Sequence, residues 1–137
     1  MNEVIRNLWV SGYGEWTEEC YGPGWSVLCM LETCQQAGFT APPLPQTKHF
    51  KIMNEPFAIP ANKLLLDAAA DYIAAELSRG QRVLVHCGAG LERSPLTIAW
   101  FLHRYHGMNL DRAYAEIRLA RPQVYDRQSW LPWEMPL

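Results

Sequence analysis

The chain has 137 residues, of which 49% are hydrophobic, 12% aromatic and 19% charged, and its formal net charge is −2. This composition supports one hydrophobic core and excludes a disordered chain, so we expect a single domain over residues 1–137. The near-neutral charge and the lack of a basic block exclude the usual pattern of a nucleic-acid-binding protein.

The first half of the chain predicts short strands separated by loops. Compact apolar runs predict strands over residues 8–10, 26–31 and 49–53. Residues 12–24 combine Gly, Glu and aromatic side chains and predict a loop or an irregular helix. Three prolines within residues 41–45 predict another loop, because proline fixes the backbone and lacks an amide donor.

The second half predicts three helices and one strand. Asn62 caps the first helix and Gly80 ends it, with four apolar residues on one face: Leu66, Ala70, Ile73 and Leu77. Residues 82–85 predict a strand. A second helix starts near Ser94 and Pro95 and ends at Gly107. Its expected buried residues are Ile98, Phe101, Leu102 and Tyr105. A third helix is expected between Asn109 and Pro122.

This alternation of strands and helices predicts an α/β fold with a mainly parallel central sheet flanked by helices. Ligands in such folds bind beyond the carboxyl ends of the strands. The strand at residues 82–85 is followed at once by His86 and Cys87. The loop that connects this strand to the next helix is therefore the expected binding site.

That loop carries the residues needed to bind a tetrahedral dianion. The segment reads His86-Cys87-Gly88-Ala89-Gly90-Leu91-Glu92-Arg93-Ser94-Pro95. A loop entering a helix presents unpaired amides and the positive end of the helix dipole. Glycines let the backbone bend around the ligand, and the Arg93 guanidinium can bind two phosphate oxygens. The same field stabilises the thiolate, so we expect Cys87 to act as a nucleophile at neutral pH.

The segment resembles the signature of the protein tyrosine phosphatase superfamily, His-Cys-x5-Arg-Ser/Thr, and in particular its small dual-specificity branch. Residues 7–12, 83–87, 107–110 and 121–122 are also similar to that branch. The resemblance implies a phosphatase acting on phosphorylated proteins or small phosphorylated molecules through a phosphocysteine. It implies no cofactor and no metal.

The resemblance also implies a role for each matching residue. Cys87 would be the nucleophile, Ser94 would stabilise its sulfur as a leaving group, and His86 would support the loop from behind. The phosphate would be bound by the Arg93 side chain and by the backbone amides of Gly88, Ala89, Gly90, Leu91, Glu92 and Arg93.

The sequence departs from the family pattern at two positions. The family places an aspartate upstream of the cysteine as the general acid, and here Asn54 and Glu55 stand in its place. Glu55 can do the same chemistry, so it is a candidate acid. Glu92 occupies a loop position where the family usually has Gly or Ser. It could serve as the acid, orient Arg93 or face solvent.

Two other functions remain open at this level. A non-catalytic phosphate-binding module would explain the missing aspartate, and a sulfurtransferase or arsenate reductase would also use a cysteine in an anion loop. The four cysteines, Cys20, Cys29, Cys34 and Cys87, show no zinc-ligand spacing. Free thiols, the lack of a secretory signal and the lack of a long apolar run lead us to expect a cytoplasmic protein without a membrane span.

Overall fold

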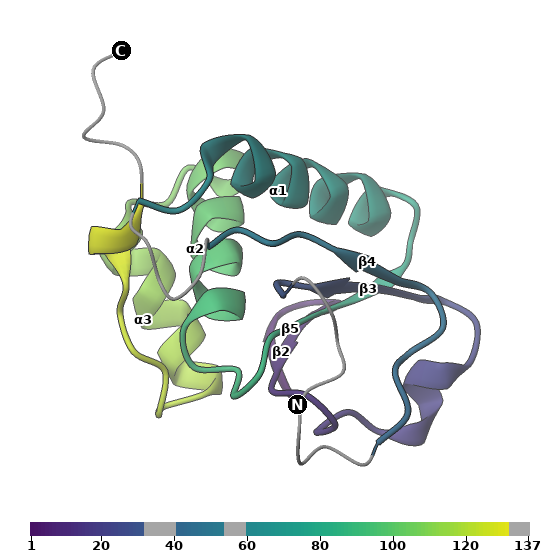
Figure 1. Ribbon diagram of the computed structural model, residues 1–137. Helices are drawn as coiled ribbons and strands as arrows, with labels where there is room; N and C mark the ends of the chain where they lie inside the picture. The colour runs from purple at the N-terminus through teal and green to yellow at the C-terminus, as the bar shows by residue number, and fades with distance from the viewer. Residues whose placement is uncertain (32–40, 54–59, 132–137) are drawn as a thin grey trace.

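A five-stranded mixed sheet forms the centre of the fold (Figure 1). The computed structural model describes residues 1–31, 41–53 and 60–131. The strands lie in the order β1-β2-β5-β3-β4, with β1 antiparallel to β2 and all other neighbours parallel. Their bounds are Asn2–Ile5 (β1), Leu8–Ser11 (β2), Trp25–Cys29 (β3), Thr47–His49 (β4) and Arg82–His86 (β5). The predicted parallel sheet is confirmed, with an antiparallel edge strand that the sequence analysis missed.

Three helices pack side by side, with α2 in the middle (Figure 1). Their bounds are Lys63–Ser78 (α1), Arg93–His106 (α2) and Leu110–Ala120 (α3), and two 3-10 turns span Glu18–Tyr21 (η1) and Gln128–Trp130 (η2). The predicted caps are confirmed: the Asn62 side chain accepts from the Leu65 amide, and that of Asn109 from the Arg112 amide. Gly107 ends α2 in the left-handed conformation, with φ of 66°. No helix within the described residues has the length and apolarity that crossing a membrane requires.

Other details of the element prediction were also wrong, and the strand expected at residues 26–31 is β3, Trp25–Cys29. The strand expected at residues 49–53 is β4, Thr47–His49, because its pairing stops where its neighbour β3 ends at Cys29. The chain then turns towards α1, and the Ile52 carbonyl accepts from the Asn62 amide at 2.8 Å. Tyr105 was expected in the core but is 47% exposed, since its hydroxyl donates to Asp71 on the surface.

The core encloses β5 and α2. Val83, Leu84 and Val85 are fully buried, as expected for a central parallel strand covered on both faces. Every residue of α2 from Ser94 to Leu102 is also buried. The loop that joins these two elements is therefore attached to rigid structure at both ends, which limits how far its functional groups can move.

Candidate active site

Three adjacent parallel strands bring the site together at the carboxyl edge of the sheet. Ser11 of β2 and Cys29 of β3 both pair with His86 of β5. Gly12, Met30 and Cys87 follow these residues, so they leave the sheet at the same edge. The Met30 amide donates to the His86 carbonyl at 2.9 Å. This edge is where parallel α/β sheets bind ligands, as the sequence predicted.

Cys87 and Ser94 meet across the loop, which we call the signature loop (residues 87–93). The Cys87 sulfur lies 3.2 Å from the Ser94 hydroxyl oxygen, and the Ser94 amide donates to the sulfur at 3.5 Å. Ser94 is the second residue of α2, so the N-terminus of that helix faces the sulfur. Hydrogen-bond donors and a helix N-terminus both stabilise negative charge on a sulfur atom. The predicted proximity of these two residues is thus present.

Glycine is required at two places where the signature loop touches the end of β2. Gly90 has φ of +72°, and a Cβ there would lie 2.4 Å from the backbone of Ser11 and Gly12. A Cβ on Gly12 would lie 2.8 Å from the carbonyl oxygen of Gly88. Real Cβ atoms do not approach backbone atoms so closely, so neither position tolerates a side chain without a backbone shift.

Besides the carbonyls that accept from α2 itself, three backbone carbonyls of the signature loop accept hydrogen bonds from other segments of the chain. The pairs are Tyr13 amide to Gly88 (2.8 Å), Arg121 Nη2 to Ala89 (3.0 Å) and Tyr125 amide to Leu91 (3.0 Å). A trans peptide directs its N–H opposite to its C=O. The amides that follow these carbonyls therefore point towards the inside of the loop, and they belong to Ala89, Gly90 and Glu92. This orientation is the one that anion binding by a loop needs.

Arg121 ties the signature loop to the start of β1 and to the segment that follows β2. Its side chain is 3% exposed and donates to Ala89, to Glu15 Oε1 at 2.8 Å and to Asn2 Oδ1 at 2.9 Å. Glu15 Oε1 also accepts from the Gly12 amide at 2.6 Å. A buried guanidinium needs such partners, and here they hold the loop against the sheet. The sequence analysis noted residues 121–122 only as a resemblance and did not foresee this role.

Glu92 is the N-cap residue of α2 and is paired with Arg127. Nε and Nη2 of Arg127 both lie 2.8 Å from Glu92 Oε2. The sequence analysis considered three roles for the Glu92 side chain, and none of them included this ion pair with Arg127. The acid role considered for Glu92 stays a prediction. The other candidate acid, Glu55, lies outside the described residues.

The remaining predicted residues lie around the same loop. Arg93 is half-buried at the first position of α2, and Leu91 is half-buried beside it. His86 is fully buried, and its ring contacts those of Tyr13 and Trp16 at centroid distances of 5.9 and 4.9 Å. Neither of its ring nitrogens has a hydrogen-bond partner within the described residues, so its contacts are those of a packed aromatic ring. The catalytic roles of all these residues remain predictions.

The other described cysteines are core residues. Cys20, Cys29 and Cys87 are buried thiols, while Cys34 lies outside the described residues. Burial raises the pKa of the Cys20 thiol. Across residues 1–31, 41–53 and 60–131, no cluster of three or more His, Cys, Asp or Glu side chains is arranged to hold a metal ion.

Comparison with known proteins identifies the family. The family model described as "Dual specificity phosphatase, catalytic domain" matches residues 32–133. The chain belongs to this family. Dual specificity protein phosphatase 1B of Arabidopsis thaliana is 27% identical over 132 residues, covering 96% of this chain and 77% of the relative. The crystal structure of human DUSP28 superposes with a TM-score of 0.72 at 20% identity, covering 98% of this chain and 91% of that one.

Other members of the family are much longer than this dual specificity phosphatase domain. Human dual specificity protein phosphatase 12 is 29% identical over 72 residues, which are 53% of this chain and 21% of the relative. The chain thus spans about a fifth of the length of such relatives. The family model and the two relatives of similar sequence are described as dual specificity phosphatases, and nothing in these comparisons favours the sulfurtransferase or arsenate-reductase alternatives.

Proposed function

We propose that this domain hydrolyses phosphate monoesters through a covalent phosphocysteine on Cys87. The observation that carries the proposal is the contact of Cys87 with Ser94 at the N-terminus of α2, inside a loop in which the amides of Ala89, Gly90 and Glu92 point inward. The family implies a phosphorylated substrate, either a protein carrying phosphotyrosine, phosphoserine or phosphothreonine or a small phosphorylated molecule.

In the first step the Cys87 thiolate attacks phosphorus and forms the S–P bond. The bond between phosphorus and the ester oxygen breaks, and that oxygen takes a proton from a general acid as the alcohol leaves. The inward amides and the Arg93 guanidinium would stabilise the charge on the equatorial oxygens. We propose Glu55 as the acid, because Glu92 is engaged by Arg127.

In the second step water attacks phosphorus and gives a proton to the carboxylate that the first step left on the general acid, while the S–P bond breaks. The electron pair of that bond returns to sulfur, and inorganic phosphate leaves. The Ser94 hydroxyl, 3.2 Å from the sulfur, would donate to the departing thiolate and lower the barrier of this step. The same residue thus serves the second step more than the first.

The test compares hydrolysis of an aryl phosphate by the wild type, Cys87→Ser and Cys20→Ser. We expect Cys87→Ser to lose at least about a thousandfold in kcat, since the nucleophile is replaced by a much weaker one. Cys20→Ser is the matched control, because it removes another buried free thiol, and it should keep the wild-type rate. Equal rates for Cys87→Ser and the wild type would refute the proposal.

A second measurement addresses the acid and the binding-module alternative. With a phosphate ester of a poor leaving group, Glu55→Gln should lose the descending high-pH arm of the pH–rate profile, while Glu92→Gln should keep it. An activated aryl phosphate needs little acid assistance. If the wild type binds inorganic phosphate but does not turn over such a substrate, the domain is a phosphate-binding module and not an enzyme.

A further inference from the structure

The carboxylate of Glu92 creates an electrostatic conflict within the signature loop. Glu92 is the N-cap residue of α2 and directly precedes Arg93. The positive end of the helix dipole attracts any anion placed there, whether a side-chain carboxylate or a substrate phosphate. An uncompensated carboxylate at this position would compete for that field and repel a phosphate dianion. Phosphate binding by the loop therefore needs a cation that neutralises Glu92.

Arg127 is placed to be that cation. Two of its nitrogens lie 2.8 Å from Glu92 Oε2. Its guanidinium carbon lies 5.2 Å from the centroid of the Tyr125 ring and 5.0 Å from that of Trp130, so two aromatic rings restrain its position. The Tyr125 amide in turn donates to the Leu91 carbonyl. The segment after α3 is thus attached to the signature loop immediately beside Glu92.

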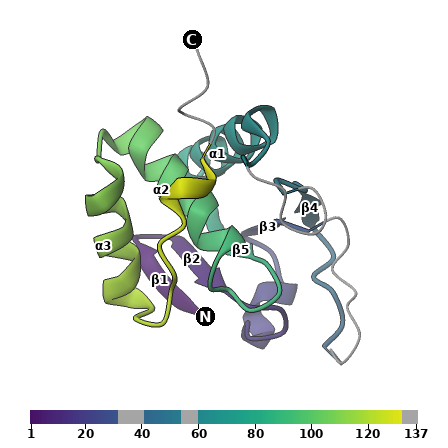
Figure 2. The same cartoon turned by 60° about the vertical axis from the view of Figure 1, so that its left-hand side comes forward.

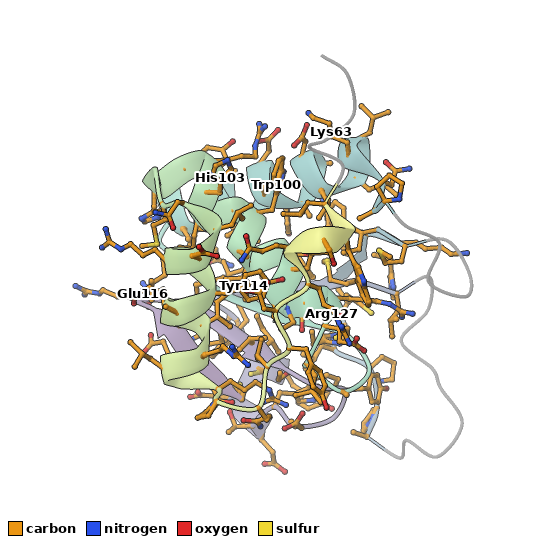
Figure 3. All side chains as sticks on the ribbon, turned by 90° about the vertical axis from the view of Figure 1, so that its left-hand side faces the viewer. Lys63, Trp100, His103, Tyr114, Glu116 and Arg127 are labelled. Carbon is orange, nitrogen blue, oxygen red and sulfur yellow. The ribbon has the colours of Figure 1, made fainter. Side chains whose placement is uncertain are left out.

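Figures 2 and 3 show where the segment after α3 and Arg127 lie in the fold. The segment that follows α3 runs beside the loop between β5 and α2 (Figure 2). Arg127 contacts that loop through Glu92, and Figure 3 shows it well apart from Lys63 on α1. Glu92 and Arg127 are 31% and 36% exposed, so their pairing is partly shielded from solvent. An ion pair this exposed contributes little to folding stability, so we look for its role in ligand binding.

We infer that Arg127 is a positioning residue that neutralises Glu92 and so keeps the signature loop able to bind a phosphate dianion. The inference rests on the proposed function, because it assumes that the loop is the phosphate site. It concerns binding more than chemistry, since Arg127 acts through Glu92 and not on the reacting atoms. It therefore predicts a change in KM and in phosphate affinity with kcat largely preserved.

The experiment measures KM and kcat on an aryl phosphate and the Kd of inorganic phosphate by calorimetry. The variants are Arg127→Gln, Arg127→Lys, Glu92→Gln and the double variant Glu92→Gln/Arg127→Gln. Exposing one carboxylate charge beside a dianion should raise KM and Kd about tenfold in Arg127→Gln, with kcat within about twofold of the wild type. The double variant should return both constants to within about twofold, and Arg127→Lys should retain them because it keeps the charge.

A matched control separates this effect from the general loss of a surface cation. Lys63→Gln removes a cation that is paired with Asp67 at 2.7 Å on α1, and we expect it to leave both constants unchanged. Urea denaturation of each variant shows whether it is folded. An unchanged phosphate Kd in Arg127→Gln, or a loss that Glu92→Gln fails to rescue, would overturn the inference.

The calorimetric arm keeps this inference distinct from the proposed function. If the wild type binds phosphate without turnover, the proposed hydrolysis fails, while the effect of Arg127→Gln on the Kd still decides the role of the pair. If the wild type turns over substrate and Arg127→Gln does not change KM or Kd, the hydrolysis stands and the inference fails. If the wild type does not bind phosphate at all, both fail together.

Discussion

Replacing Gly90 with alanine should destabilise the protein far more than the same change at another left-handed glycine. Gly80 has φ of +82°, and no other part of the described chain lies within 4 Å of the place that a Cβ would take. At Gly90 a Cβ would lie 2.4 Å from the backbone of Ser11 and Gly12. Gly80→Ala therefore costs only the strain of holding an alanine in the left-handed conformation, roughly 1–2 kcal/mol. Gly90→Ala adds a steric overlap with backbone atoms, which typically costs about 1–3 kcal/mol more.

The assay is urea denaturation of the wild type, Gly80→Ala and Gly90→Ala, with unfolding monitored by tryptophan fluorescence. We expect Gly90→Ala to lose about 2 kcal/mol more free energy of unfolding than Gly80→Ala, a factor of roughly thirty in the unfolding equilibrium. Phosphate binding should weaken in Gly90→Ala alone, because the loop has to move away from β2. Equal free-energy losses within about 0.5 kcal/mol would refute the argument that close approach of the loop to β2 requires glycine.

Three further predictions concern other parts of the fold. Hydrogen bonding from Ser26 and Arg79 holds the pKa of Glu76 in the folded protein below its ordinary value of 4.5. The ionised Glu76 therefore stabilises the fold above pH 4.5, and this stabilisation is lost as the pH falls through the pKa of the folded state. Glu76→Gln should cost about 1–2 kcal/mol at pH 7 and show a shallower loss of stability below about pH 4.5 in urea titrations; an unchanged acid dependence would contradict this. Arg121→Met should cost about 2–3 kcal/mol in the same assay and weaken phosphate binding, while Arg112→Met, at an exposed site on α3, should stay within about 0.5 kcal/mol. Ser94→Ala should show a burst of aryl alcohol followed by a steady state at least about tenfold slower, and the absence of a burst would argue against its role in the second step.

The elements that could be predicted from sequence are those with a strong local pattern. The helix over residues 63–78 carries apolar residues at helical spacing with Asn62 as its cap, and it was predicted nearly in full. The strand β1 was missed because only four residues form it, and none is fully buried. The end of β4 was misplaced because its extent depends on its neighbour β3 and not on its own residues.

The candidate site likewise has a part that could be predicted from sequence and a part that could not. Cys87, Arg93 and Ser94 form one contiguous motif, so their grouping followed from the chain itself. Arg121 and Arg127 reach the loop only after α3 has packed, and no local pattern indicates a contact between residues so far apart. For this reason the sequence left the direction of the Glu92 side chain open, and the ion pair with Arg127 was not among the alternatives.

The way the signature loop is held has a consequence for the order of folding. Arg121 bonds to Asn2 across 119 positions and to Glu15 across 106, so the loop depends on contacts that join both ends of the described chain. Contacts of such high sequence separation close late, because their entropy cost is met only once much of the structure exists. We therefore expect refolding chains to recover their helical signal before they recover affinity for phosphate.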